Sequence, residues 1–233
     1  MIKNNTTIKF RLTNADFVEN LTITEVNSSI EGISLYNLEF LFNDRQKHEV
    51  KLVWNEDIYG ISSIYIPTAE SSHKYHPSYR PTTVNSSIFL VSPLIIAVSA
   101  RNTSVLNISI SDCLYSHKLS IGAKEADGLS ECAITFFSSF ATNKNTYSCQ
   151  LRIDRRDYDF NKSLKSVSDY LYNVNNIKVY VPKYSYEPLY STWYNFHRNI
   201  YQDQLLEEMK EASLEQAMEA RELQRSASQP AGQ

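Results

Sequence analysis

The fold is decided by Leu35-Tyr36-Asn37-Leu38-Glu39-Phe40-Leu41-Phe42, in which apolar and polar side chains alternate. A second apolar stretch, Glu49-Val50-Lys51-Leu52-Val53-Trp54, follows after a polar connection. Successive side chains of a β-strand point to opposite faces of a sheet, so alternation with a period of two predicts a strand buried on one face. Asn43-Asp44-Arg45-Gln46 has the composition of a turn. This region therefore predicts two strands joined by a turn.

The same pattern continues on both sides of these two stretches. Upstream, Thr7–Leu12 places Ile8, Phe10 and Leu12 on one face of a predicted strand, and Leu21–Val26 repeats the signal. Downstream, further strands are predicted at 87–91, 94–100, 105–111, 119–123, 132–137 and 147–153. Strands this frequent, with no helical stretch between them, favour a mainly β chain folded as an antiparallel sandwich over a βαβ fold.

The periodicity of the sequence changes at Asp159–Asn173. Leu164, Val167 and Leu171 recur there at helical spacing, which predicts a helix with one apolar face. Asp159 or Asn161 is the candidate N-cap, because a short polar side chain can accept a hydrogen bond from the first helical turn.

Two further segments and two loops complete the outline of the chain. Gln204–Arg225 is rich in strong helix formers and predicts a second helix, and Ser226–Gln233 has the composition of a disordered tail. Ile66–Pro81 is predicted to be a long exposed loop, which serves either binding or surface connection. Lys124–Gly128 predicts a charged hairpin turn.

Composition excludes several classes of protein. The 233 residues carry a formal net charge of -3, so no basic field is available to hold nucleic acid or an anionic membrane. We find no apolar run long enough to cross a bilayer, and Met1–Thr6 does not have the pattern of a signal peptide. Cys113, Cys132 and Cys149 are odd in number and widely spaced, which predicts reduced thiols. No zinc-ligand spacing occurs, and we expect neither a metal nor a cofactor.

The aromatic stretch Pro188-Leu189-Tyr190-Ser191-Thr192-Trp193-Tyr194-Asn195-Phe196-His197 resembles the first barrel strand of the melibiase-type α-galactosidases, glycoside hydrolase family 36. Members of that family carry a P-x-Y-S-T-W-Y-x-F-H segment there. Three upstream stretches resemble parts of the family's N-terminal β-sandwich, namely Trp54 with Asp57–Gly60, Ala100–Asn102 with Ile108–Asp112, and Leu151–Asp157. The resemblance covers roughly residues 1 to 210.

The resemblance implies a β-supersandwich followed by a (β/α)8 barrel that cleaves terminal α-galactosyl groups with retention, in the cytoplasm of a bacterium. Such chemistry needs two carboxyl groups about 5 Å apart. No residue of this chain matches either catalytic aspartate, and the family's D-D-G-W segment is absent. After Glu208 the chain departs from the family's first barrel helix. We therefore expect an N-terminal piece of such an enzyme, truncated just inside the barrel.

The resemblance and the periodicity together predict three parts of the chain. Residues 1–182 form the β-sandwich with a helix near 160–173. Residues 183–225 form a linker and the first β/α unit of an incomplete barrel, which contributes an isolated barrel strand and a C-terminal helix. Residues 226–233 form the disordered tail.

Trp193 and Tyr194 are the candidate substrate-binding residues. In the whole enzyme a strand at this place would aim Trp193 at the sugar pocket, where an indole face stacks on galactose. The alternative is an aromatic pair that packs on the sandwich or lies partly exposed. We expect no catalytic residue in this chain.

Two groups of titratable residues are candidates for independent sites. Asp154, Asp157 and Asp159 alternate with Arg152, Arg155 and Arg156, which predicts a salt-bridged segment with ionised carboxylates. His73 and His76 have no carboxylate or cysteine at ligand spacing, which favours exposed loop histidines.

Two functions remain open at this point. The first is an inactive N-terminal fragment of an α-galactosidase-like enzyme, whose partners would be α-galactosides in the full-length protein. The second is a non-catalytic module for carbohydrate binding or oligomerisation, which allows a homo-oligomer as partner. In that case Tyr75, His76 and Tyr79 of the 66–81 region, with the preceding Tyr65, would contact sugar or protein.

Overall fold

The computed structural model describes residues 2–5, 8–14, 16–43, 49–68, 75–77, 82–86, 91–124, 129–138, 145–178, 180–186 and 201–227. These residues belong to two compact units, Met1–Lys178 and Val179–Gln233.

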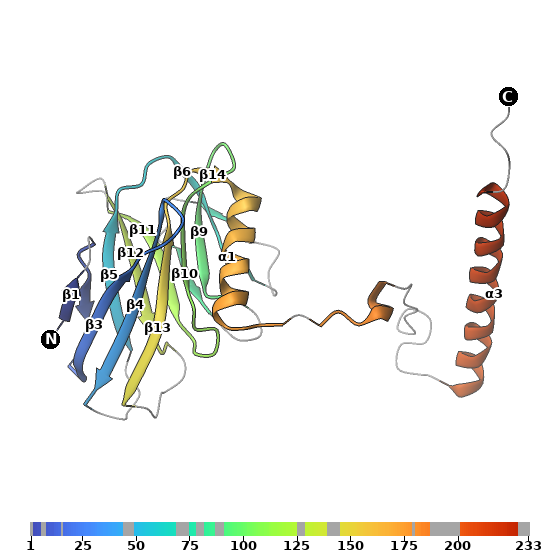
Figure 1. The fold of residues 1–233 in the computed structure, drawn as a ribbon, viewed down its shortest axis with the longest axis horizontal. Coiled ribbons are helices and arrows are strands. Elements are labelled where there is room, and N and C mark those ends of the chain that lie inside the picture. Colours follow the sequence, from blue (N-terminus) through green and yellow to red (C-terminus); the bar gives the residue numbers. More distant parts are fainter. Residues whose placement is uncertain are drawn as a thin grey trace. The chain divides into compact units, whose positions relative to one another are not determined.

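The first unit is built from two β-sheets (Figure 1). The larger sheet has the spatial order β1 (Ile2–Asn5), β3 (Val18–Val26), β4 (Ile33–Phe42), β13 (Thr146–Asp154), β10 (Thr103–Ile110), β9 (Leu94–Ser99), β6 (Ile61–Tyr65) and β7 (Tyr75–Pro77), and β14 (Tyr158–Asp159) pairs with β10. The smaller sheet has the order β2 (Arg11–Thr13), β5 (Val50–Glu56), β12 (Leu129–Phe136), β11 (Lys118–Lys124) and β8 (Thr82–Asn85). Pairing is antiparallel except between β1 and β3, so the predicted mainly β, antiparallel fold class is confirmed.

The core lies between the inner faces of the two sheets. On β4 the side chains of Tyr36, Leu38 and Phe40 are at most 2% exposed, whereas Asn37 and Glu39 between them are exposed. The Phe40 ring lies 5.0 Å from that of Phe136 on the smaller sheet, measured between centroids. Full burial of one such side chain contributes about 1.5–3 kcal/mol, so the alternation in the sequence sets both the strand and its inner face.

Helix α1 (Phe160–Val174) covers part of the outer face of the larger sheet. Its Phe160, Val167 and Leu171 form a second apolar cluster with side chains from β9 and β6. The helix occupies nearly the residues that the sequence predicts. Asp159 is its N-cap, because the Asp159 side chain accepts a hydrogen bond of 3.0 Å from the backbone N–H of Lys162.

A polar clasp joins the two sheets. Arg155, which follows β13 of the larger sheet, donates two hydrogen bonds of 2.8 and 2.7 Å to the carboxylate of Glu56 on β5. The same carboxylate accepts a hydrogen bond of 2.8 Å from the indole N–H of Trp54. Arg155 also donates to the hydroxyl of Ser34 on β4. Glu56 is 6% exposed, so its charge is compensated almost wholly from within the protein.

The second unit is described at a 3-10 helix, Lys183–Tyr186, and at α3 (Gln202–Ala227). The predicted C-terminal helix is therefore present. The prediction of a disordered tail from Ser226 is wrong for Ser226 and Ala227, which are helical because the run of strong helix formers before them continues into them. Residues 228–233 and the predicted barrel strand at 188–197 lie outside the described residues. No described helix combines the length and apolar character needed to cross a bilayer.

One strand prediction and one loop prediction need correction. The strand predicted at Thr7–Leu12 begins only at Arg11, since β2 pairs with β5 over three residues. Ile8, Phe10 and Leu12 nonetheless contact the core, as the pattern predicted. Within the predicted 66–81 loop, Tyr75–Pro77 forms β7 against β6, because the Tyr75 ring packs 5.2 Å from that of Tyr65. Of the strand predicted at 87–91 only Val91 is described, and it forms an isolated bridge with Thr68.

Replacement of Glu56 tests the clasp. Glu56→Ala removes the acceptor of both Arg155 and the Trp54 indole. We expect it to lower the free energy of unfolding by about 3 kcal/mol, because it leaves the Arg155 guanidinium without its counter-ion beside the core. Glu131→Ala is the matched control, since Glu131 pairs with Arg11 at the surface and an exposed pair contributes about 1 kcal/mol or less. Urea unfolding followed by tryptophan fluorescence measures both; equal losses would contradict the clasp.

Candidate functional site

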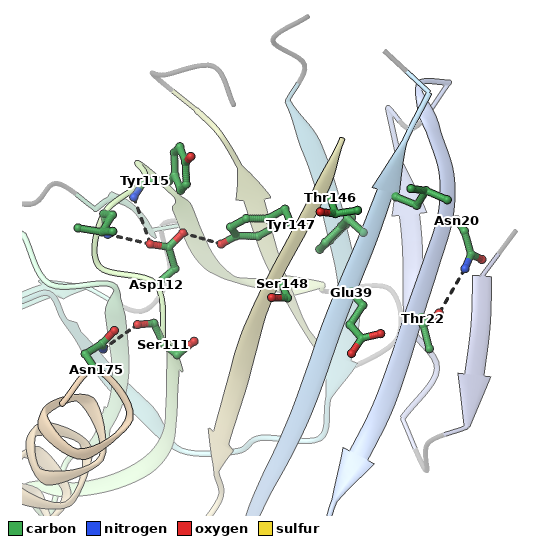
Figure 2. Close-up of a pocket in the computed structure, with 13 residues that line it drawn as sticks. Asn20, Thr22, Glu39, Ser111, Asp112, Tyr115, Thr146, Tyr147, Ser148 and Asn175 are labelled. Atoms are coloured by element: carbon green, nitrogen blue, oxygen red, sulfur yellow. Dashed lines mark hydrogen bonds between the residues drawn. The ribbon is translucent and has the colours of Figure 1, made fainter. Parts of the chain in front are cut away.

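A surface cavity of the first unit has a volume of about 680 Å³ and lies on the outer face of the larger sheet. Figure 2 shows side chains from β3, β4 and β13 along one side of it and the segment after β10 on the other. Polar side chains dominate its lining, and they include Asn20, Thr22, Glu39, Ser111, Asp112 and Ser148.

A polar row crosses three adjacent strands at this cavity. Thr22 of β3 lies directly opposite Glu39 of β4, and Glu39 lies directly opposite Ser148 of β13. Side chains opposite each other in an antiparallel sheet are about 5 Å apart at Cβ, so these three form a continuous line of oxygen atoms. Asn20 extends the row, since its side-chain amide donates to the Thr22 hydroxyl at 3.3 Å.

Asp112 organises the opposite rim. Its Oδ1 accepts hydrogen bonds from the backbone N–H groups of Leu114 and Tyr115, at 2.8 and 3.2 Å. Its Oδ2 accepts a hydrogen bond of 2.7 Å from the Tyr147 hydroxyl and lies 3.0 Å from Nε2 of His117, which is fully buried. The short turn after β10 is therefore held to the interior through one carboxylate.

The helix layer also contacts this rim. The side-chain amide of Asn175, just beyond α1, donates to the backbone carbonyl of Ser111 at 2.8 Å. The Ser111 hydroxyl in turn accepts a hydrogen bond of 2.9 Å from the backbone N–H of Gln150 on β13. The rim is thus hydrogen-bonded both to the residue that follows α1 and to the larger sheet.

The electrostatics of Asp112 do not suit a general acid. Burial raises the pKa of Asp112, but hydrogen bonds from His117, Tyr147 and the Leu114 N–H outweigh it and hold that pKa below its ordinary value of 3.8. Burial raises the pKa of Tyr147, and Cys149 and Asp112 raise it further. Asp112 therefore stays ionised and Tyr147 stays protonated near neutral pH.

The cysteines do not contribute a nucleophile. Burial raises the pKa of the Cys149 thiol to about 12 and the pKa of the Cys132 thiol well above its ordinary value. Burial also raises the pKa of Cys113, which is partly exposed. All three are free thiols, as the sequence predicts, and a protonated thiol is a poor nucleophile.

The arrangement can bind a polar, hydroxyl-rich molecule. Its side chains are hydroxyls, amides and carboxylates, with the exposed Leu114 and the partly buried Tyr115 as an apolar edge. Among the described residues no cluster of His, Cys, Asp and Glu has the geometry of a metal site.

The sequence predicts sugar binding by Trp193 and Tyr194 and, for the second function, by Tyr65, Tyr75, His76 and Tyr79. Trp193 and Tyr194 lie outside the described residues, as do His73 and Tyr79. Tyr65 and Tyr75 pack on Phe160 of α1, with ring centroids 5.0 and 6.0 Å from its ring, and Tyr75 remains 51% exposed. His76 is a partly buried residue of β7, so the prediction of an exposed loop histidine is wrong there.

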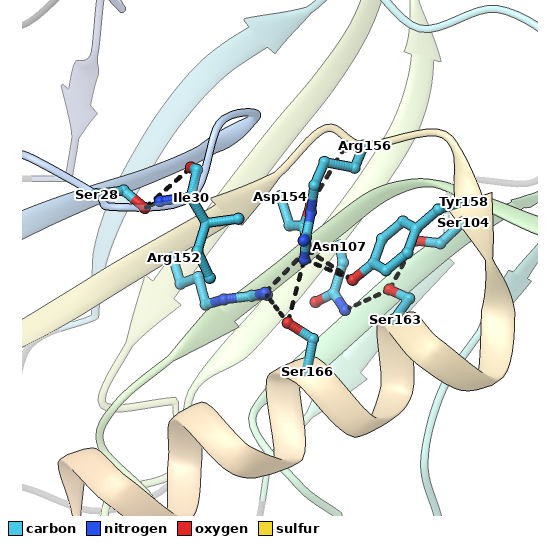
Figure 3. A network of polar contacts seen from close by, with 10 residues as sticks. All are labelled: Ser28, Ile30, Ser104, Asn107, Arg152, Asp154, Arg156, Tyr158, Ser163 and Ser166. Carbon is cyan, nitrogen blue, oxygen red and sulfur yellow. Dashed lines mark hydrogen bonds and ion pairs between the residues drawn. The ribbon is translucent and has the colours of Figure 1, made fainter.

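The predicted salt-bridged segment is present (Figure 3). Asp154 forms ion pairs with Arg152 at 2.9 Å and with Arg156 at 2.7 Å. Burial raises the pKa of Asp154, but the hydrogen bonds and charges of the two arginines outweigh it and hold that pKa below its ordinary value. Asp159 serves as the helix cap instead.

Sequence reasoning missed Glu39, Asp112 and Tyr147. Asp112 did carry a local signal, because Ser-Asp directly after a strand is typical of a turn in which the carboxylate binds its own backbone. Nothing in the sequence pairs Asp112 with Tyr147, 35 residues away.

No protein-family model matches the chain, and no curated protein matches its sequence. Its fold is similar to solved structures of the α-N-acetylgalactosaminidase NagBb from Bifidobacterium bifidum. The complex with Gal-NHAc-DNJ is 12% identical over 72% of this chain and 34% of that chain, with a TM-score of 0.38. The ligand-free form is 11% identical over 72% and 33%, with a TM-score of 0.37. The chain spans about a third of the length of that enzyme. At these values the likeness carries no argument about function.

The ionised Asp112 predicts a pH-dependent contribution to stability. Its pKa is lowered on folding, so the contribution is complete above the ordinary value of 3.8 and is lost as the pH falls through the folded-state pKa. Asp112→Asn should therefore lower the free energy of unfolding by about 2 kcal/mol at neutral pH, with a smaller difference from wild type in acid.

Urea unfolding between about pH 3 and pH 7 measures this difference. Tyr147→Phe removes one donor to the same carboxylate and should reproduce part of the effect. A gap between wild type and Asp112→Asn that is constant over this range would refute the linkage.

Proposed function

We propose that this chain is the non-catalytic, N-terminal β-sandwich portion of an α-galactosidase-like glycoside hydrolase, and that it does not hydrolyse α-galactosides by itself. The observation that carries the proposal is the direction in which the pKa is displaced at two described carboxyl groups, those of Asp112 and Asp154. Retaining hydrolysis needs one carboxyl whose pKa is raised so that it can protonate the leaving group. Asp112 and Asp154 both have lowered pKa values, each through hydrogen-bond donors that surround it.

The segments that resemble the family support the proposal through their contacts. Glu56, beside Trp54 in the first segment, is bound by Arg155 of the third. The second segment lies on β10 and pairs in register with the third on β13 over Asn107–Ile110 and Leu151–Asp154. The three stretches that resemble the family are separate in the sequence but contact one another in the fold. Such contacts are expected if the stretches belong to one shared sandwich domain.

In this proposal the hydrolytic chemistry belongs to a barrel that follows Pro188. Trp193 and Tyr194 would contact the terminal galactosyl group there, with the indole face on the sugar ring. The sandwich would support the barrel and contact a second copy of the protein. The enzyme would act on α-galactosides in the bacterial cytoplasm.

An assay with p-nitrophenyl α-galactoside tests the proposal. We expect the purified chain to release nitrophenol no faster than buffer, because neither Asp112 nor Asp154 has the raised pKa that protonation of the leaving group requires. An active α-galactosidase run beside it controls for the substrate. Enzyme-like release that Asp112→Asn or Trp193→Ala abolishes would overturn the proposal.

A second candidate function, carbohydrate binding by the sandwich itself, is favoured by the polar row of Thr22, Glu39 and Ser148. Sugars are bound through adjacent hydroxyls, and three side-chain oxygens in register on a rigid sheet can accept or donate to them. This function needs no catalytic carboxyl.

Titration with galactose, followed through backbone amide resonances, tests this second candidate. We expect shifts confined to β3, β4, β13 and the turn after β10, with affinity lowered about tenfold or more in Glu39→Ala, since a charge-assisted hydrogen bond contributes about 1.5–3 kcal/mol. Glu31→Ala, at an exposed turn before β4, is the matched control. Unchanged affinity in Glu39→Ala would exclude the polar row.

A further inference from the structure

A second cavity, of about 590 Å³, lies between α1 and the turn that precedes β4. Cationic side chains line it from two sides, with Arg152 and Arg156 from the sheet side and Lys162 and Lys165 from the helix (Figure 3 shows the two arginines). The polar row of the first cavity has no such excess of cations, so the two sites differ in chemistry.

The arginines share a single counter-ion. Asp154 is 1% exposed and accepts from Nη2 of Arg152 at 2.9 Å and from Nε and Nη2 of Arg156 at 2.9 and 2.7 Å. Its pKa lies below its ordinary value, so it supplies one full negative charge against two guanidinium groups. Arg152 is 2% exposed, which places an uncompensated positive charge at the edge of the protein interior.

The lysines add to this excess. Lys165 forms an ion pair with Asp169 at 3.0 Å, so that pair is neutral. Lys162 has no acidic partner among the described residues and adds a second unmatched charge. The Tyr170 ring, 5.7 Å from the Arg152 guanidinium carbon, attracts that cation but brings no negative charge.

Hydrogen-bond donors remain free around the cavity. Nη1 of Arg152 is buried without a partner among the described residues. Buried donors are rarely left in that state, and Arg152 is one of the residues that line this cavity. The Ser166 hydroxyl accepts from both arginines at 3.0 and 3.1 Å, which leaves its proton to be donated elsewhere.

The backbone is shaped to hold Arg156 there. Gly32 has a φ of +81°, and a Cβ atom at this position would lie 2.6 Å from Cγ of Arg156. Only glycine meets both conditions, because it tolerates a left-handed backbone and leaves space for the passing side chain. The conformation of this turn therefore leaves the space that Arg156 needs to join the cation cluster.

We infer that the cavity between α1 and the turn before β4 binds an oxyanion group, that is a phosphate, sulfate or carboxylate, through Arg152, Arg156, Lys162 and Ser166. Guanidinium groups match planar and tetrahedral oxyanions in charge and geometry, and an ammonium group beside them adds a mobile point charge. The bound group would neutralise the buried excess. This function is independent of α-galactoside hydrolysis, whose substrates are neutral.

Calorimetric titration of the full chain with inorganic phosphate, sulfate and acetate at constant ionic strength tests the inference. We expect saturable one-to-one binding of at least one of them, and neutral galactose should not compete with it. Lys162→Gln removes an exposed cation without disturbing the core and should weaken binding about threefold or more, while Arg156→Gln should weaken it about tenfold or more. Arg101→Gln, which removes an exposed cation elsewhere in the same unit, is the matched control and should bind as wild type.

Gly32→Ala provides an independent variant that keeps every charge. It should displace Arg156 and weaken binding while circular dichroism shows an intact β-fold. The inference is overturned if none of the three anions binds with saturation, or if Lys162→Gln, Arg156→Gln and Arg101→Gln lower affinity equally, since that result would mean only a general ionic attraction.

Discussion

The structure depends on the burial of one face of β4 and β13 against the smaller sheet. Tyr36, Leu38 and Phe40 must all point inward together, because a shift of one residue would exchange them for Leu35, Asn37 and Glu39. The same alternation also determines which side chains of these strands face outward. Glu39 and Ser148 therefore reach the outer cavity as a consequence of the pattern that forms the core, and the site needs no separate scaffold.

Strand geometry separates three arginines near the end of β13, namely Arg152, Arg155 and Arg156. Arg152 points to the outer face and lies under α1, where it shares Asp154 with Arg156. Arg155 follows the strand end and reaches the opposite sheet, where it binds Glu56. These arginines thus form two contacts, one between the two sheets and one between the larger sheet and α1. At each contact they compensate a carboxylate that would be costly to bury alone.

Much of the sandwich could be predicted because its strands alternate clearly. The predicted positions of β4, β5, β9, β10, β12 and β13 agree with the structure to within a few residues, as does α1. The failures have physical causes: β7 and β14 are too short for a periodic signal, and β7 ends in proline. Phe10 contacts Trp54 and Tyr36 just before β2, although the backbone of Phe10 is not paired with another strand. The pattern therefore predicted the burial of Phe10 correctly and its strand conformation wrongly.

The candidate sites were harder to predict than the fold. The acidic and basic residues of 152–159 were recognised as a salt-bridged segment because both charges are adjacent in the sequence. Glu39 and Asp112 line one cavity only because β4, β13 and β10 are neighbours in the sheet, and that order cannot be read from local periodicity. The oxyanion site depends on Gly32 and Arg156, which are far apart in the chain and meet only in the folded turn.

The position of β9 has a consequence for how the first unit can be divided. Ile95 and Ala97 face the sandwich interior, while Leu94, Ile96 and Val98 face α1, so both sides of this strand are covered. Helix and sandwich consequently behave as one cooperative body, and amide hydrogens on β9 should exchange with solvent among the slowest in the chain. An expression boundary placed before Phe160 would leave a bare apolar sheet and favour aggregation, whereas one placed after Lys178 respects the folded body.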